Sequence, residues 1–238
     1  MPRFFVDEVK EKFHVLSGND TAHIIKSLRM KPGEEITLCS GDNFDYFCII
    51  DKIVADEVHL AVKEKRPNIS EPETKITLYQ SIPKLDKMEL IVQKCVEIGV
   101  YKIVPLMTSR CVSRPNNGAM GRKIERWRKI SKEAAKQSGR GIVPEVLEAV
   151  NIKNICSLSS YDESIVFYEC GGDRLSEILT AKPRNIAVFV GPEGGFETEE
   201  IEYLTGLGAR KASFGPRILR TETAAIAAVT LTLYQSGE

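Results

Sequence analysis

The stretch VFVGPEGGFETEEI at residues 188–201 is the clearest indication of the fold, because an apolar run leads there into a glycine loop and then a helix. The run IAVFVG (186–191) is short and nearly all apolar, which is typical of a parallel strand buried on both faces. Glycines at a strand-to-helix junction let backbone amides approach a ligand closely. The loop is neither GxGxxG nor GxxxxGK[ST], so the dinucleotide and P-loop motifs are excluded.

A second glycine loop opens the stretch SFGPRILRTETAAIAAVTLTLYQ at residues 213–235. Gly215-Pro216 interrupts the chain there, and Thr221 or Thr223 can cap the helix that follows. This helix is apolar almost all round, so we expect it to be buried and its first turn to lie inside the protein.

Two arginines, Arg217 and Arg220, precede this helix and would therefore lie at its buried beginning. Because a buried guanidinium is costly unless it is paired, we expect Arg220 to contact Glu222, Glu193 or a ligand. The alternative to a role in ligand binding is that Arg220 forms a purely structural salt bridge.

The rest of the region after residue 72 alternates strands and helices. Apolar runs predict further strands at 76–82, 100–106 and 164–169. Helical periodicity predicts helices at 87–98, 122–138, 197–207 and 223–234. This alternation indicates an α/β domain with a parallel sheet.

The N-terminal region differs, because β-branched and aromatic runs are split there by turn residues. We expect strands at FFV (4–6), ITLCS (36–40), FDYFCIIDKIV (44–54) and EVHLAVKEK (57–65). One short helix is expected at 19–29, capped by Asn19 or Asp20. A small antiparallel barrel with one helix fits this pattern, and the polar segment 65–75 marks a linker.

The 33 basic and 33 acidic residues of the 238-residue chain cancel, but they are unevenly distributed. Residues 84–140 carry 14 basic and 5 acidic side chains, whereas the segments before and after are acidic. A concentrated block of Lys and Arg favours a polyphosphate partner such as RNA. A solvated helix face rich in lysine is the alternative.

Other features argue against whole classes of protein. No apolar run approaches the ~20 residues needed to span a bilayer, and the N-terminus lacks the apolar core of a signal peptide. We therefore expect a cytoplasmic protein. Six cysteines without a CxxC pair and only three histidines predict reduced thiols and no metal site.

Six motifs spread over the chain occur together in one order: RFFV (3–6), HIIKSLRMKPGE (23–34), KLDKMELIVQKCVEIGV (84–100), KEAAKQSGR (132–140), GPEGG (191–195) and FGPRILRTETAA (214–225). This set resembles the RsmE family, the 16S rRNA uracil-N3 methyltransferases of the SPOUT superfamily. Because the motifs run from the first predicted element to the last, the resemblance covers the whole chain.

The resemblance implies two domains, a PUA-like RNA-binding β-barrel at 1–72 and a SPOUT methyltransferase domain at 73–238. The α/β chain of the second domain would be tied in a trefoil knot, a feature that no periodicity can show. The implied cofactor is S-adenosylmethionine (SAM), held by three loops of the knot. The implied partners are 16S rRNA, within the small ribosomal subunit, and a second copy in a homodimer.

The implied SAM-binding residues lie at the end of one strand and in the two glycine loops: Tyr168, Glu169, Val190, Gly191, Pro192, Glu193, Gly194, Gly195, Phe214, Gly215, Ile218, Leu219, Arg220, Thr223 and Ala224. For catalysis, Arg220 is our candidate for stabilising the charge that spreads over the uracil carbonyls as N3 loses its proton. Glu222 is the candidate general base, with Glu193 as a second carboxylate.

The basic block and the N-terminal motifs supply the candidate RNA contacts: Arg3, Arg29, Lys84, Lys87, Arg110, Arg126, Lys132 and Arg140. Most such contacts would position phosphates, while the target base must leave its stack to be methylated. Arg114 and Arg122 flank Pro115-Asn116-Asn117-Gly118 and are expected on a mobile loop.

Two other functions stay open on the sequence. One is a non-catalytic rRNA-binding assembly factor, which the presence of all three cofactor loops disfavours. The other is a related SPOUT methyltransferase that acts on tRNA, which competition between tRNA and small-subunit RNA would distinguish.

Overall fold

The computed structural model describes residues 1–10, 12–111 and 117–238 and divides the chain into two compact units. The first unit comprises residues 1–71 and 135–143, and the second comprises 72–134 and 144–238. The chain therefore returns to the first unit once after leaving it. The predicted division into 1–72 and 73–238 therefore leaves residues 135–143 out of the first unit.

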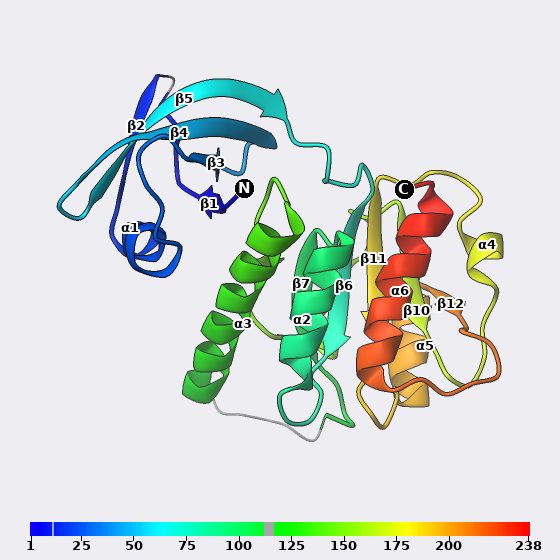
Figure 1. Cartoon of the computed structure of the whole chain (residues 1–238). Helices are drawn as coiled ribbons and strands as arrows, with labels where there is room; N and C mark the ends of the chain where they lie inside the picture. The colour runs from blue at the N-terminus through cyan, green and yellow to red at the C-terminus, as the bar shows by residue number, and fades with distance from the viewer. Residues whose placement is uncertain (11, 112–116) are drawn as a thin grey trace. The chain divides into compact units, whose positions relative to one another are not determined.

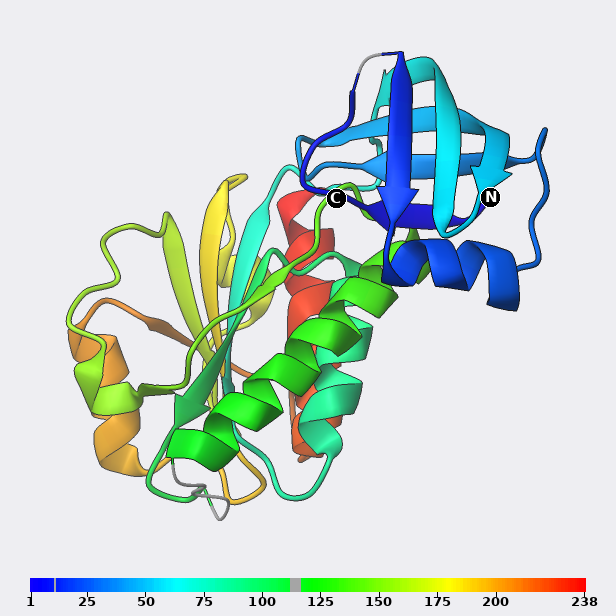
Figure 2. The same ribbon diagram turned by 90° about the vertical axis from the view of Figure 1, so that its left-hand side faces the viewer.

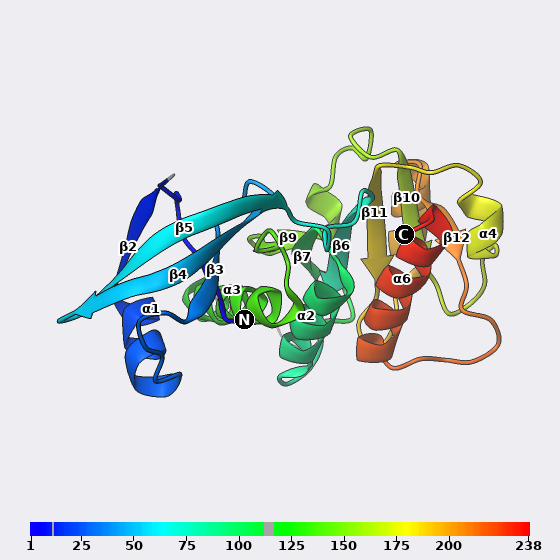
Figure 3. The same ribbon diagram turned by 45° about the horizontal axis from the view of Figure 1, so that its top comes forward.

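The first unit is a curled five-stranded sheet with the strand order β1-β3-β4-β5-β2 (Figures 2 and 3). Its strands are β1 (Arg3–Phe5), β2 (Phe13–Ser17), β3 (Glu35–Cys39), β4 (Phe44–Val54) and β5 (Glu57–Pro67). Neighbouring strands are antiparallel except β1 and β3, which pair in parallel and depart from the expected antiparallel pattern. Inward side chains such as Phe4, Ile50 and Leu60 form the core of this unit.

One short helical segment joins β2 to β3. Helix α1 (Asn19–Ala22) continues as a π-helical turn over His23–Ser27, in which the Leu28 amide bonds to the His23 carbonyl. The predicted cap at Asn19 or Asp20 is wrong, because Gly18 occupies the N-cap position and no side chain caps the helix. The completely buried Ile24 attaches the segment to the core.

The second unit is built on a parallel sheet with the order β12-β10-β11-β6-β7-β8, in which β9 also pairs with β7 (Figure 1). Its strands are β6 (Lys75–Ser81), β7 (Lys102–Met107), β8 (Glu145–Val146), β9 (Val150–Asn151), β10 (Glu163–Phe167), β11 (Asn185–Val190) and β12 (Arg210–Ala212). Every pairing is parallel, as the sequence predicts.

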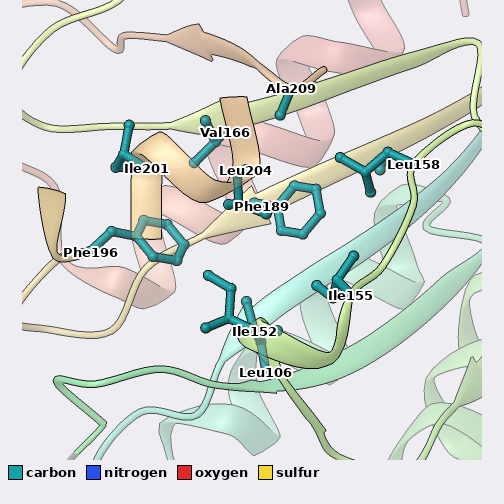
Figure 4. Packing of buried hydrophobic residues seen from close by; sticks show 11 residues of the cluster. Leu106, Ile152, Ile155, Leu158, Val166, Phe189, Phe196, Ile201, Leu204 and Ala209 are labelled. Carbon is teal, nitrogen blue, oxygen red and sulfur yellow. The ribbon is translucent and has the colours of Figure 1, made fainter. Parts of the chain in front are cut away.

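Helices cover both faces of this sheet (Figure 2). On one face lie α2 (Lys87–Ile98), α6 (Thr221–Ser236) and the portion of α3 (Asn117–Ser138) that belongs to this unit. On the other lie α5 (Thr198–Gly206) and the 3-10 turn Ile152–Asn154, while α4 (Leu175–Ile178) packs beside α6 and β12. Figure 4 shows the core under α5, where Phe196 and Leu204 pack with Phe189 and Val166 of the sheet.

Helix α6 is not buried all round, so that prediction is wrong. Ala225, Ala228 and Val229 are completely buried, whereas Leu231 is 45% exposed and Tyr234 is 77% exposed. Because residues three apart lie on the same side of a helix, Leu231 and Tyr234 form an uncovered apolar stripe. Helix α6 is therefore apolar on two sides, of which one packs into the core and the other is exposed.

The structure also shows the state of the cysteines and whether the described residues could bind a metal ion or span a membrane. Four cysteines are buried and two, Cys156 and Cys170, are exposed, and all six are free thiols. Within the described part of the chain, no group of three His, Cys, Asp or Glu side chains is arranged to hold a metal ion, and no helix is long and apolar enough to cross a membrane. The trefoil knot stays a prediction, because strand order alone does not establish how the chain is threaded.

Candidate active site

The carboxyl ends of β6, β10 and β11 point to the same edge of the parallel sheet, at the bottom of Figure 1. Ligands of open parallel sheets bind at this edge, where connections leave a strand in opposite directions. The sheet of this protein has such a place, because β6 lies between β11, far along the chain, and β7, which follows it. A pocket opens beside it.

The pocket brings together most of the residues predicted to hold the cofactor. The residues that were predicted to hold the cofactor and that line this pocket come from the end of β10, the β11 loop and the segment that leads into α6. They are Tyr168, Glu169, Val190, Gly191, Pro192, Glu193, Gly194, Gly195, Phe214, Gly215, Ile218, Leu219 and Ala224. Phe167, Ser213, Arg217 and Thr221 also line it and were not among the predicted residues. Arg220 and Thr223 are exposed at the beginning of α6 and do not line it.

Glycine is required in the β11 loop because two loops approach each other there. Gly195 has a φ of 71°, and a Cβ at this position would collide with the Glu169 carboxylate. A Cβ on Gly194 would come within 3.3 Å of the Arg110 side chain. The bare backbone therefore allows the β11 loop to lie against its neighbours and leaves the pocket open.

A buried hydrogen-bond chain ties the two glycine loops together. Thr221 donates its hydroxyl hydrogen bond to the Gly191 carbonyl over 2.7 Å and accepts one from Gln80 Nε2 over 3.1 Å. Gln80 is completely buried at the end of β6. The predicted threonine cap is wrong, because Arg220 occupies the N-cap position and Thr221 bonds to the other loop instead. No sequence signal identifies Gln80, because its partner Thr221 lies far away in the chain.

Lys87 bridges the two carboxylates that the sequence proposes for catalysis. Its Nζ lies 3.0 Å from Glu193 Oε1 and 3.2 Å from Glu222 Oε2. Glu193 also accepts the Lys84 backbone amide at 3.1 Å. Burial opposes ionisation of Glu193, but hydrogen bonds from backbone amides and Lys87 hold the pKa of this carboxyl below its ordinary value. The hydrogen bond with Glu193 in turn raises the pKa of Lys87.

The structure affects the two predicted catalytic residues differently. Arg220 is exposed, so its expected burial is wrong, and within the described residues its guanidinium pairs with neither Glu222 nor Glu193. A contact between Arg220 and a ligand stays a prediction. Glu222 faces Lys87 of α2 and does not line the pocket, which argues against its role as general base. Its Oε2 atom has ion-pair distance to Lys87 but no hydrogen bond of good geometry among the described groups.

Two of the predicted RNA contacts lie inside the first unit. Arg3 donates to Asp45 over 2.8 Å, and Arg140 donates to Glu71 over 2.6 Å. Arg140 is only 2% exposed. A guanidinium buried in an ion pair cannot reach an RNA phosphate without losing that pair, which argues against an RNA contact by Arg140; the contact stays a prediction.

Other predicted RNA contacts brace the second unit. Arg110 donates to Glu197 over 2.8 Å and to the Gly194 carbonyl over 2.6 Å, which fixes the β11 loop. Arg126 pairs with Glu89, and Lys87 with the two carboxylates described above. The candidates without such an ion pair in the described structure are Arg29, Lys84 and Lys132.

The predicted mobile loop falls partly outside the described structure. Arg114, Pro115 and Asn116 lie outside the described residues. Arg122 belongs to helix α3 and is exposed there, so its placement on a loop is wrong.

Two known family models match the chain, and together they cover both of its units. Residues 70–233 match the model of an RNA methyltransferase domain, and residues 16–63 match that of an RNA methyltransferase PUA domain. The chain belongs to the RNA methyltransferase family. Its curled N-terminal sheet is accordingly PUA-like, and the glycine loops lie in its methyltransferase domain.

Relatives of this RNA methyltransferase match it over almost its entire length. The Ribosomal RNA small subunit methyltransferase E of Bacillus subtilis is 32% identical over 249 aligned positions, covering 99% of this chain and 97% of the relative. The protein of the same name from Mesomycoplasma hyopneumoniae is 33% identical, covering 97% and 98%. The crystal structure of Ribosomal RNA small subunit methyltransferase E from Neisseria gonorrhoeae bound to SAM is similar with a TM-score of 0.89 and 30% identity, covering 98% of this chain and 97% of that one.

Proposed function

We propose that this RNA methyltransferase transfers the methyl group of SAM to N3 of one uridine in 16S rRNA of the small ribosomal subunit, in the cytoplasm. The observation that carries the proposal is the glycine-lined pocket at the carboxyl edge of the parallel sheet. The Neisseria gonorrhoeae relative, which is bound to SAM and named for small-subunit ribosomal RNA, supports both cofactor and substrate.

The residues of the pocket fit SAM chemically. Phe167 and Phe214 stack with ring centroids 4.4 Å apart and give the pocket an apolar, aromatic side. Glu169 and Glu193 place two carboxylates in the lining, which suits a ligand that carries a sulfonium and an ammonium. When bound, SAM supplies an already activated methyl group, so the protein chiefly has to align it with the nucleophile.

The chain's own residues then act on the uracil. As the N3–H bond breaks, negative charge spreads over N3 and the flanking carbonyl oxygens. The N3–CH3 bond then forms as the S–CH3 bond breaks, which consumes this charge and leaves the sulfur as a neutral thioether. Arg220 has a guanidinium without a partner in the described structure and stands at the start of α6, so we assign it to that charge. Glu193 is a weak base because its pKa is held low, so we assign the departing proton to solvent.

We also propose a homodimer that covers the exposed stripe of α6. Leu231 and Tyr234 are large apolar side chains left open on a helix otherwise packed into the core. A second copy presents the same stripe, and a twofold contact brings the two together. Tyr234→Lys is expected to convert the dimer to a monomer in light scattering. A wild-type chain that is already monomeric contradicts this proposal.

The test of the activity is methyl transfer from labelled SAM to small subunits that lack the modification, with the product nucleoside identified by mass spectrometry. 3-Methyluridine at a single site is the expected result. If small subunits accept no methyl group, naked 16S rRNA and tRNA are the next substrates, and methylation of tRNA alone supports the tRNA enzyme. Failure on all three, with RNA binding retained, supports the non-catalytic assembly factor.

A further inference from the structure

Three charged side chains from different parts of the chain meet beside the cofactor pocket. Lys87 is the first residue of α2, Glu193 belongs to the β11 loop, and Glu222 belongs to the first turn of α6. Their side chains are partly shielded from solvent, with 29% of Lys87, 24% of Glu193 and 15% of Glu222 exposed. The two carboxylates therefore come from the β11 loop and the start of α6, which both contribute to the pocket lining, and the lysine comes from a segment outside the lining.

The connection before Lys87 is fixed at a second point. The Lys84 amide donates to both oxygens of Glu193, at 3.1 and 3.3 Å. Between these two anchors, Leu85 adopts a φ of 56°, a left-handed conformation that is unfavourable for a leucine. Such a conformation persists only where the surroundings impose it, so the β6–α2 connection is held firmly against the β11 loop.

The charge of Lys87 offsets repulsion between the two carboxylates. Within the described residues, Lys87 is the ion-pair partner of both Glu193 and Glu222. Without the ammonium, the two negative charges would face each other with no cation between them, and like charges at this separation repel. The β11 loop and the start of α6 would then move apart, although the Thr221 bond to Gly191 still joins them.

We infer that Lys87 is a positioning residue of the SAM site, and this inference rests on the proposed function. Lys87 does not line the pocket and acts through Glu193, which does. It keeps the β11 loop and the start of α6 at the separation that SAM requires. This role replaces the RNA contact that the basic block of the sequence predicts for Lys87.

The first experiment measures SAM affinity by calorimetry on the full-length chain without RNA. Lys87→Met keeps the length of the side chain and removes its charge, and it is expected to weaken SAM binding by at least about fivefold. Lys87→Arg restores most of the affinity because the charge returns. Lys94→Met is the matched control, since Lys94 lies on the same helix and pairs with Glu97 away from the pocket; it leaves SAM affinity unchanged.

A second variant separates charge repulsion from general damage to the fold. Adding Glu222→Gln to Lys87→Met removes one of the two facing charges, so SAM affinity is expected to rise above that of Lys87→Met alone. In turnover measurements, Lys87→Met raises KM for SAM and leaves KM for RNA unchanged. A disrupted helix α2 would give neither the rescue nor this separation.

Two results would overturn the inference. One is unchanged SAM affinity in Lys87→Met together with weaker RNA binding and a smaller salt dependence, which marks Lys87 as a phosphate contact. The other is a Lys87→Met, Glu222→Gln chain that binds SAM no better than Lys87→Met. A wild-type chain that binds no SAM contradicts the proposed function itself, and thus the two failures are distinguishable.

Discussion

Arg140 donates two hydrogen bonds from its guanidinium to the carboxylate of Glu71, over 2.8 and 2.6 Å. The side chains are 2% and 10% exposed. The same carboxylate also accepts the backbone amide of Gly141 at 2.8 Å. This buried pair holds the segment that follows α3 within the first unit, to which both residues belong.

Breaking this pair is expected to destabilise the protein without changing its RNA chemistry. Arg140→Met leaves the Glu71 carboxylate buried without its guanidinium, which costs about 3–5 kcal/mol. Denaturant unfolding measures the loss. Lys129→Met, an exposed position on α3, is the control and should change stability by no more than about 0.5 kcal/mol. An Arg140→Met chain of normal stability and reduced RNA affinity would restore Arg140 as an RNA contact.

Gly195→Ala tests the close approach of the cofactor loops. The left-handed backbone disfavours any L side chain by roughly 1–2 kcal/mol, and the new Cβ must also displace the Glu169 carboxylate. SAM affinity is therefore expected to fall about tenfold, as measured by calorimetry. Gly206→Ala, at the end of α5 where a Cβ meets open space, should bind SAM normally. Equal affinity of the two variants would show that the loop does not contact the cofactor.

Thr221→Val tests the bond between the glycine loops. The substitution keeps the shape of the side chain but leaves the Gly191 carbonyl and the Gln80 amide without this hydroxyl, at a cost of about 1–3 kcal/mol. We expect a lower unfolding midpoint and weaker SAM binding in the same variant. Thr221→Ser retains the hydroxyl and should recover SAM binding; if it does not, the methyl group rather than the hydrogen bond matters.

The stability of the first unit is expected to fall in acid because of Asp45. Burial opposes ionisation of this carboxyl, but hydrogen bonds from Arg3 and Asn68 hold its pKa below the ordinary value of 3.8. A pKa lower in the folded chain means that the stabilisation is complete above the unfolded pKa and is lost as pH falls through the folded one. Urea midpoints of wild type should therefore drop below about pH 4, more steeply than those of Asp45→Asn. Parallel pH profiles of the two chains would contradict this.

Local sequence patterns predicted an element correctly where residues at or next to its two ends mark its bounds. Strand β4 and helix α2 have the bounds that the sequence predicts, 44–54 and 87–98, because turn residues or glycines lie at their ends. Short strands such as β8 and β12 were not predicted, since two or three residues carry no period and form a strand only through their neighbours. Pairing across the sheet, not propensity, creates them.

Charge was the property that the sequence described least well. A run of Lys and Arg predicts a basic surface, but Arg110, Arg126 and Arg140 each have a carboxylate partner distant in the chain. No spacing rule identifies such partners, because they meet only after the chain has folded. The same holds for Lys87, which the sequence presents as one more cation of the basic block.

The parallel α/β domain, the N-terminal sheet and the glycine loops of the pocket could be predicted from the sequence, because apolar periodicity and glycine act through the backbone of neighbouring residues. The ion pairs between carboxylates and cations, the bond by which Thr221 joins the loops and the exposed side of α6 became known only from the folded structure. These depend on side chains brought together from distant positions, and their pairing follows from the packing of the sheet and its helices rather than from any local pattern.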